Sequence, residues 1–236
     1  MKILCVSDFV DPLVYNTRVK ETFPDIDLIL CAGDLPMDYM DFLVSIFNKP
    51  TYFIFGNHNL KEFPLYHKNA AITPGDHHNV RNNHNQGHGF VYAGFKCIKD
   101  YSLPVKNPLK DEKTPLLIVG ASGCLKYNKG MAQYSDRQMK INLLKLVPRL
   151  FFNKIRYGRY LDIFLTHASP RHIHDHDDPC HKGFETFNWF IQKFKPTYMV
   201  HGHIHLYDSR EERITKVDET TVVNAYSHCI IELQQD

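Results

Sequence analysis

His201-Gly202-His203-Ile204-His205 follows the apolar run Tyr198-Met199-Val200, and this stretch says most about the fold of the chain. The apolar run predicts a buried strand that ends where the histidines begin. In an extended segment residues two apart project to the same side, so His203 and His205 would form a pair of imidazoles. Imidazole is a ligand for divalent transition metals. The stretch therefore predicts part of a metal site, provided that other strand ends supply further ligands.

Other short apolar runs also end in residues that can bind a metal ion. The runs at 2–7, 28–32, 52–55 and 161–166 are followed by Asp8, by Gly33-Asp34, by Gly56-Asn57-His58 and by His167. Each run is continuous and apolar, which is typical of a strand covered on both faces. In an open α/β sheet, ligands bind outside the carboxyl ends of the strands. We therefore expect an α/β fold in which all these side chains meet at one edge.

In this order, the strand-end residues resemble the motifs of the calcineurin-like metallophosphoesterase superfamily. The resemblance runs from residue 3 to about residue 226, and its most specific parts are Gly56-Asn57-His58 and Gly202-His203-Ile204-His205. It implies a sandwich of two mixed β-sheets flanked by helices, with two metal ions between the sheet ends. The length permits one large α/β domain, so we expect residues 1–236 to form a single metallophosphoesterase domain.

The resemblance also implies a role for each matched residue. Asp34 would bridge two divalent cations, and His58 would bind no metal but face the substrate. The other ligands would be Asn57, His167 and His203 for the second cation, and Asp8 and His205 for the first. Imidazole suits Mn, Fe, Zn, Co and Ni alike, so the residues do not single out one metal.

The implied activity is metal-dependent hydrolysis of a phosphate diester or monoester. Two cations about 3.5–4 Å apart clamp the attacking and leaving oxygens, and metal-bound hydroxide is available near neutral pH. His58 is suited to protonate the leaving alkoxide or to donate a hydrogen bond to the phosphoryl oxygen. The substrate would be a small phosphoester or a nucleotide. A diester is favoured, because a histidine at this element is typical of diesterase members.

The first motif departs from the family pattern Asp-x-His, because Asp8-Phe9-Val10 ends in a valine that cannot bind a metal. Three interpretations stay open: the first cation binds more weakly, another side chain replaces the histidine, or the site works with one tightly held metal. Asp11 is the first candidate for a replacement. Tyr15, Asp38 and Tyr39 are also near in sequence. Asp11 before Pro12 equally fits the cap of a helix from Pro12 to Glu21.

The second motif departs from the pattern as well. The family usually places Asp or Glu after the histidine to orient its imidazole, and here Asn59 follows His58. The asparagine carbonyl can accept a hydrogen bond, but it adds no charge that would raise the pKa of the histidine.

The missing histidine motivates a second hypothesis, in which a catalytically weakened member is a metal-containing scaffold for protein interaction. The chain nevertheless keeps His58 and every ligand of the second cation. Loss of function would be expected to spread through the site, so this retention favours the enzyme.

Histidines also cluster in the stretches that adjoin the motifs. Segment 170–181 has two prolines and dense charge, which predicts a loop over the site. Arg171 would contact phosphate through its guanidinium. Further substrate contacts are predicted for His174, Asp177, His181 and, in the stretch 76–89, His88. The alternative for each of these is a solvated loop residue.

Composition excludes other classes of protein. A net charge of +2 does not support a nucleic-acid-binding surface, and we expect no dedicated region of that kind. The chain has no run of about 18 apolar residues, so we expect no membrane span. Its six cysteines lack paired spacing, which favours reduced thiols in a cytoplasmic protein.

Between the motifs, the pattern predicts helices at 38–48, 135–148 and 183–194. Two short strands at 90–94 and 96–100 are expected to form a hairpin around Gly94, and the Pro- and Lys-rich connection 102–115 is expected to be a turn region.

Overall fold

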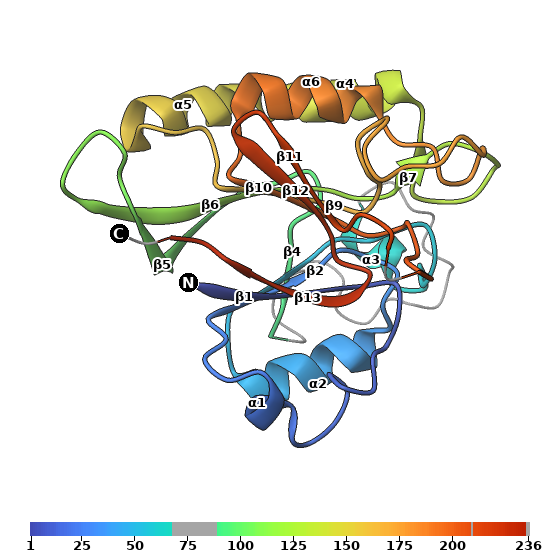
Figure 1. Ribbon diagram of the computed structural model, residues 1–236. Helices are drawn as coiled ribbons and strands as arrows, with labels where there is room; N and C mark the ends of the chain where they lie inside the picture. Colours follow the sequence, from blue (N-terminus) through green and yellow to red (C-terminus); the bar gives the residue numbers. More distant parts are fainter. Residues whose placement is uncertain (68–88, 209, 235–236) are drawn as a thin grey trace.

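Two mixed β-sheets pack face to face in the computed structural model, which describes residues 1–67, 89–208 and 210–234. Helices cover the outer face of each sheet, so that four layers are visible in Figure 1. The sandwich expected from the sequence is confirmed. In chain order the elements are β1 (Lys2–Ser7), α1 (Val19–Thr22), β2 (Leu28–Cys31), α2 (Met37–Phe47), β3 (Thr51–Phe53), α3 (Phe63–Tyr66), β4 (Val91–Tyr92), β5 (Cys97–Lys106), β6 (Lys113–Ala121), β7 (Cys124–Leu125), β8 (Gln133–Tyr134), α4 (Asp136–Leu144), α5 (Val147–Tyr157), β9 (Ile163–Thr166), α6 (Glu185–Phe194), β10 (Tyr198–His201), β11 (Ile214–Val217), β12 (Thr220–Asn224) and β13 (Ser227–Glu232).

The strand order explains why the candidate ligands meet. The first sheet has the order β13-β1-β2-β3-β4, in which β1 to β4 are parallel. The second sheet has the order β11-β12-β10-β9-β6-β5, in which β12, β10, β9 and β6 are parallel. The carboxyl ends of parallel strands lie at one edge of a sheet, so the loops that follow them converge.

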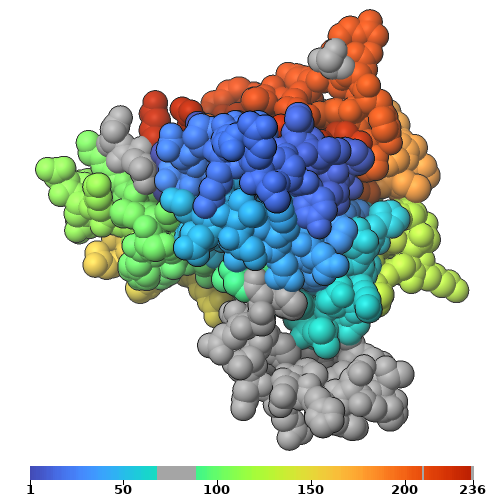
Figure 2. Space-filling view, turned by 90° about the horizontal axis from the view of Figure 1, so that it is seen from below, coloured from blue at the N-terminus to red at the C-terminus, as the bar shows by residue number. Residues whose placement is uncertain are grey.

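Three apolar clusters hold the layers together. One lies between the two sheets and contains Leu30 and Val200. Another joins the second sheet to α4, α5 and α6 through residues such as Phe164. The third joins the first sheet to α1 and α2 and includes Leu43 and Phe53. Figure 2 is seen from this third side, where N-terminal residues cover the centre of the face.

The expected hairpin at 90–100 is wrong. β4 pairs with β3 in the first sheet, whereas β5 pairs with β6 in the second, so the chain crosses between the sheets here. Gly94 is bridged to Gly120 at the crossing point. A Cβ at Gly120 would stand 2.5 Å from the carbonyl oxygen of Ala93, so glycine permits this close approach.

The connection 102–115 is also more regular than expected. β5 continues to Lys106 and β6 begins at Lys113. Pro104 lies on β5, which is an edge strand and therefore tolerates the missing N–H. Pro115 precedes the part of β6 that pairs with β9, which begins at Ile118. Neither proline therefore removes a hydrogen bond from the middle of the sheet.

The helix expected from Pro12 to Glu21 is reduced to the single turn of α1. The side-chain amide of Asn16 donates to the carbonyls of Pro12 and Leu13, which competes with regular helical bonding. The expected helices at 38–48 and 183–194 appear as α2 and α6. The one expected at 135–148 appears as α4, which ends at Leu144, and a second helix, α5, begins at Val147 and extends beyond the expected range to Tyr157. Within the described ranges, no helix has the length and apolar character needed to cross a membrane.

Replacing Phe164 by alanine should destabilise the fold strongly. Its buried ring packs 4.3 Å from that of Phe190, between the second sheet and α6. We expect Phe164→Ala to lower the free energy of unfolding by about 3–5 kcal/mol, measured by urea denaturation. As a control, Phe152→Ala on the exposed side of α5 should change it by less than about 1 kcal/mol. Equal effects of the two substitutions would contradict this account of the core.

Candidate metal centre

The two sheets contribute different chemical groups to the centre. Asp8, Asp34 and Asn57 follow β1, β2 and β3 of the first sheet. His167, His203 and His205 follow β9 and β10 of the second sheet. Carboxylate and amide oxygens from one sheet therefore face imidazoles from the other.

Three of these residues adopt a backbone conformation that is uncommon outside glycine. The φ angles are 64° at Asp8, 58° at Asp34 and 68° at His203. A left-handed conformation at a non-glycine residue is strained, by about 1 kcal/mol or more, and such strain clusters at functional sites. All three lie within three residues of a strand end, so the chain turns sharply where each candidate ligand is presented.

His167 is the centre of the group expected to hold the second cation. Its Nδ1–H donates to the carbonyl of Ala32 at 2.9 Å, which orients the ring. Its Nε2 lies 3.2 Å from Oδ2 of Asp34 and 3.0 Å from Oδ1 of Asn57. The buried imidazole thus directs one nitrogen at two oxygens that both suit a cation.

His203 completes this group. Its ring centroid lies 4.8 Å from that of His167, and its Nε2 donates to the carbonyl of Cys180 at 2.7 Å. The second nitrogen, Nδ1, remains for a metal. One ligand atom from each of Asp34, His167 and His203 lies within 4.8 Å of the other two, and all three residues are buried. With the Asn57 oxygen, the donor set fits a divalent transition metal.

Asp8 and His205 form the group expected to hold the first cation. Oδ2 of Asp8 accepts from the backbone N–H of His203 at 2.9 Å. Oδ1 of Asp8 is buried, has no hydrogen-bond partner among the described residues, and lies 3.7 Å from Nε2 of His205. A buried carboxylate oxygen without a partner is costly, and a cation would satisfy it.

His203 and His205 do not project to the same side as expected. β10 ends at His201, and the left-handed conformation of His203 turns the chain away from an extended path. His203 contacts His167, whereas His205 stacks on Tyr226 at a centroid distance of 4.8 Å and lies beside Asp8. The two histidines therefore belong to different groups of side chains, His203 to that of His167 and His205 to that of Asp8.

Glycines allow the two sheets to approach. A Cβ at Gly202 would overlap the side chains of Ser7 and Asp8. One at Gly56 would overlap the carboxylate of Asp34 and the ring of His167. Any side chain at either position would push the carboxylates and the imidazoles apart.

The carboxylates and histidines strongly perturb one another. Burial alone would lower the pKa of His167, but the Asp34 carboxylate outweighs it and raises the pKa to about 9. Burial would raise the pKa of Asp34, yet His167 and the backbone N–H of His58 lower it to about 2. The pKa of His203 falls to about 4, through burial and repulsion by His167. Without a metal, the protonated ring of His167 therefore supplies the positive charge beside Asp34 that a bound cation would otherwise supply.

The structure does not bring Asp11 to the ligand group. Its Oδ1 accepts from the backbone N–H of Leu13 at 2.8 Å. Its Oδ2 accepts from Oγ of Ser227 at 2.5 Å and from Nδ1 of His228 at 2.6 Å. The carboxylate joins the loop after β1 to the start of β13.

The other candidates for replacing the missing histidine also lie elsewhere. Tyr39 is in the core and Tyr15 packs on it, while Asp38 is exposed. Val10 packs against the cluster under α1 and α2.

Three of the predicted loop contacts are directed elsewhere. The guanidinium of Arg171 donates to Asp175 at 2.6 Å and to Asp177 at 2.7 Å, so Arg171 and Asp177 pair within their own loop. Nδ1 of His174 lies 2.9 Å from Nε2 of His201, and its Nε2 lies 2.8 Å from the hydroxyl of Thr215. Both nitrogens of His174 are therefore used in a packed polar contact.

His181 does lie beside the metal group. Its ring centroid is 5.5 Å from that of His203, and its Nδ1 is 3.0 Å from the carboxylate of Asp178. His58 is exposed at the rim, and its backbone N–H donates to Asp34 at 2.7 Å. The amide of Asn59 donates to the carbonyl of Asp34 at 2.9 Å, which ties the second and third strand ends together. His88 lies outside the described residues.

Sequence reasoning missed Tyr127, whose hydroxyl accepts from Nδ2 of Asn57 at 3.2 Å. A signal was present, because the apolar run 116–122 is another buried strand, β6, and its carboxyl end lies at the same edge as that of β9.

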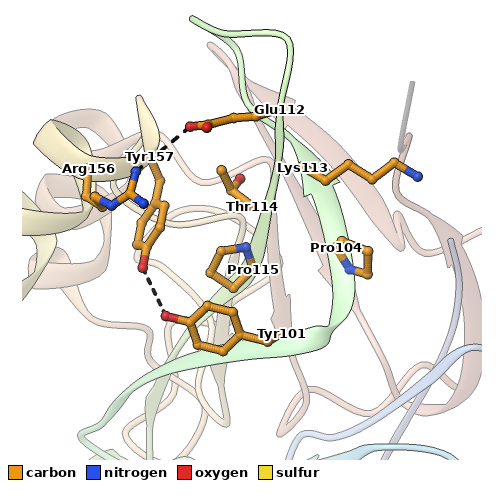
Figure 3. A pocket seen from close by; sticks show the side chains of 8 residues that line it. All are labelled: Tyr101, Pro104, Glu112, Lys113, Thr114, Pro115, Arg156 and Tyr157. Atoms are coloured by element: carbon orange, nitrogen blue, oxygen red, sulfur yellow. Dashed lines mark hydrogen bonds and ion pairs between the residues drawn. The ribbon is translucent and has the colours of Figure 1, made fainter.

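The pocket in Figure 3 is a different feature of the surface. It has a volume of about 280 Å³ and is lined by Lys113, Thr114 and Pro115 at the amino end of β6, opposite the metal group.

Metal binding should become tighter as the pH rises. His167, with a pKa of about 9, is protonated at pH 7, and a cation must displace its Nε2 proton. His203, with a pKa of about 4, is already neutral there. We expect about one proton to be released from His167 for each cation bound at the second position. Calorimetry in buffers of different ionisation enthalpy measures this number, and a pH-independent affinity between pH 6 and 9 would contradict it.

Removing the charge of Asp11 should affect stability rather than metal content. Asp11→Asn weakens the hydrogen bonds to Ser227 and His228, so we expect a loss of about 1–3 kcal/mol in the free energy of unfolding. The metal count per chain, measured by elemental analysis, should stay at the wild-type value. Loss of a cation in this variant would instead make Asp11 a ligand.

Comparisons with known proteins agree with this geometry. The calcineurin-like phosphoesterase family matches residues 1–207 of the chain. The solved structure of TT1561 of Thermus thermophilus is similar with a TM-score of 0.60 and 14% identity, over 96% of this chain and 89% of that one. A second solved structure is similar with a TM-score of 0.62 and 13% identity, over 98% of this chain and 94% of that one. At these identities the structural likeness speaks for the fold alone.

A comparison with curated proteins found no match in sequence. The family match nevertheless covers most of the chain, and it includes every strand end that carries a candidate ligand. The chain therefore belongs to the calcineurin-like phosphoesterase family, whose members are metal-dependent phosphoesterases.

Proposed function

We propose that this protein is a metal-dependent phosphohydrolase that cleaves a small phosphoester or a nucleotide, with a phosphodiester favoured over a monoester. The observation that carries the proposal is the convergence of Asp34, His167 and His203 from two different sheets. Structural ion pairs rarely need two buried histidines around one carboxylate, whereas a transition-metal site does.

The cations would activate a water for attack on phosphorus and neutralise charge on the phosphoryl group. The protein has to hold the ligands and assist the leaving group. Oδ1 of Asp34 accepts from the backbone N–H of His58, which keeps this histidine next to the carboxylate that would hold the cations. The exposed ring of His58 can then meet a substrate and donate a proton to the leaving alkoxide.

The proposed ligands of the two cations differ in how firmly neighbouring groups hold them. His167 and His203 each donate their second N–H to a backbone carbonyl, which fixes both rings. In the described residues the first position has only Asp8, Asp34 and the half-exposed His205. We therefore propose a two-metal site with a weakened first position, and manganese is the first metal to test. The weakened position is also the specific feature behind the alternative of a metal-containing interaction scaffold.

The protein is proposed to work in the cytoplasm. All six cysteines are free thiols, and three of them, Cys5, Cys31 and Cys124, are buried. Burial raises the pKa of the Cys31 thiol, which suits a structural role. Unpaired cysteines persist in a reducing compartment.

The assay that tests the enzyme uses Mn or Co and bis-p-nitrophenyl phosphate. We expect metal-dependent turnover that falls by about 10²–10⁴-fold in His58→Ala. His172→Ala is the matched control, because this exposed histidine lies 3.9 Å from Glu185 at the start of α6 and should retain wild-type turnover. Equal turnover by the His58 variant would remove its catalytic role. No turnover on any phosphoester with either metal would favour the scaffold.

The metal count distinguishes the two-cation site from a single-cation site. We expect one ion per chain after gel filtration without added metal, and a second when Mn is in excess. A single ion that does not change with excess metal would contradict the two-cation proposal.

A further inference from the structure

Tyr127 contacts the metal centre from a part of the chain outside the family's ligand motifs. It follows β7 in the segment that continues from the carboxyl end of β6. Its hydroxyl oxygen accepts a hydrogen bond from Nδ2 of Asn57 at 3.2 Å, although the two residues are 70 positions apart. The ring is partly buried at the rim of the centre.

The contact matters because Asn57 is the neutral oxygen ligand of the group. Oδ1 of Asn57 lies 3.0 Å from Nε2 of His167, at the position where a cation would be bound. An amide oxygen is a weaker ligand than a carboxylate, and the amide can rotate about its terminal bond. The Tyr127 hydroxyl holds the nitrogen end and thereby fixes the plane of the amide. The oxygen end then stays directed at the metal position.

The tyrosine is itself held rigidly. The backbone N–H groups of Tyr127 and Asn128 both donate to Oε1 of Gln133, at 3.2 and 3.1 Å. Nε2 of Gln133 donates to Oδ1 of Asn128 at 2.7 Å, which closes the loop between β7 and β8. A side chain that positions a metal ligand is effective only when its own segment is fixed.

We propose that Tyr127 positions Asn57 for the second cation and donates a hydrogen bond from its hydroxyl to an oxygen of the bound phosphoryl group, without transfer of the proton. The Tyr127 oxygen accepts from Asn57, so its O–H is not used in this contact and can donate to another group. The proposal rests on the metal-dependent function proposed above. It places Tyr127, which follows β6 and β7, in the same centre as Asn57, which follows β3, and His167, which follows β9.

The test compares Mn affinity in the wild type, Tyr127→Phe, Asn57→Ala and the double variant, by competition with a fluorescent chelator. Loss of an outer partner of a ligand costs about 10–100-fold in metal affinity, so we expect Tyr127→Phe to weaken the tight site by that factor. In the Asn57→Ala background, Tyr127→Phe should cause no further loss, because the tyrosine acts through Asn57. A purely structural role would lower the affinity equally in both backgrounds.

Tyr134→Phe is the matched control. Tyr134 lies in β8 of the same segment and packs edge-on against Phe95, with a centroid distance of 5.5 Å. We expect it to bind Mn as the wild type does. Circular dichroism and thermal melting of all variants verify that each one is folded.

The hydrogen bond that Tyr127 is proposed to donate to the phosphoryl group is tested separately, by phosphate binding. At saturating Mn, inorganic phosphate should bind Tyr127→Phe roughly 2–10-fold more weakly than the wild type, which is the loss expected for one hydrogen bond. Wild-type Mn affinity in Tyr127→Phe, or an undiminished effect in the Asn57→Ala background, would overturn the positioning role. Unchanged phosphate binding would overturn the donor role. Failure of the wild type itself to bind Mn would overturn the metal centre and this proposal together, and it is recognised before any variant is compared.

Discussion

Two buried carboxylates carry negative charge that must be balanced, and the rest of this structure depends on how that charge is balanced. Asp8 and Asp34 both come from the first sheet, in an environment where unbalanced negative charge is costly. The second sheet provides the balancing groups, the ring of His167 for Asp34 and the backbone N–H of His203 for Asp8. The two sheets therefore have to meet closely at their carboxyl ends. One oxygen of Asp8 still has no hydrogen-bond partner among the described residues and faces only the Nε2 of His205, at 3.7 Å.

This close meeting has a conformational cost that the layered core offsets. Left-handed residues at Asp8, Asp34 and His203, and glycines at 56 and 202, make the strand ends strained and locally free of side chains. The strain persists because the strands behind it are fixed by apolar packing on both faces. Side chains that follow closely on fixed strand ends are placed more accurately than side chains in the middle of long loops, which suits the close spacing of the candidate ligands.

The two halves of the centre are supported unequally. In the half built around His167, backbone carbonyls and Tyr127 hold the groups that would bind the metal. In the half built around Asp8, position 10 is a valine that packs into an apolar cluster, and His205 is 40% exposed and supported by tyrosine rings. Of the two proposed cation positions, the one around His167 would therefore be the more rigid, because hydrogen-bonded partners behind a ligand hold it in place.

The sequence by itself predicted that the candidate ligands meet, because an apolar run followed by a ligand residue is a local pattern that parallel strands bring to one edge. The sandwich of two sheets was implied by the resemblance of these motifs to the family, and the structure confirms it. Only the tertiary structure decided which other polar residues belong to the centre. Asp11 pairs with Ser227 and His228, more than 200 positions away, and Tyr127 reaches Asn57 across 70 positions. The sequence also did not predict that the chain crosses between the sheets at Gly94, because Gly94 pairs there with Gly120 from another segment. Hydrogen bonds of loop side chains depend on partners brought close by folding, and neither the spacing nor the composition of a local segment specifies those partners.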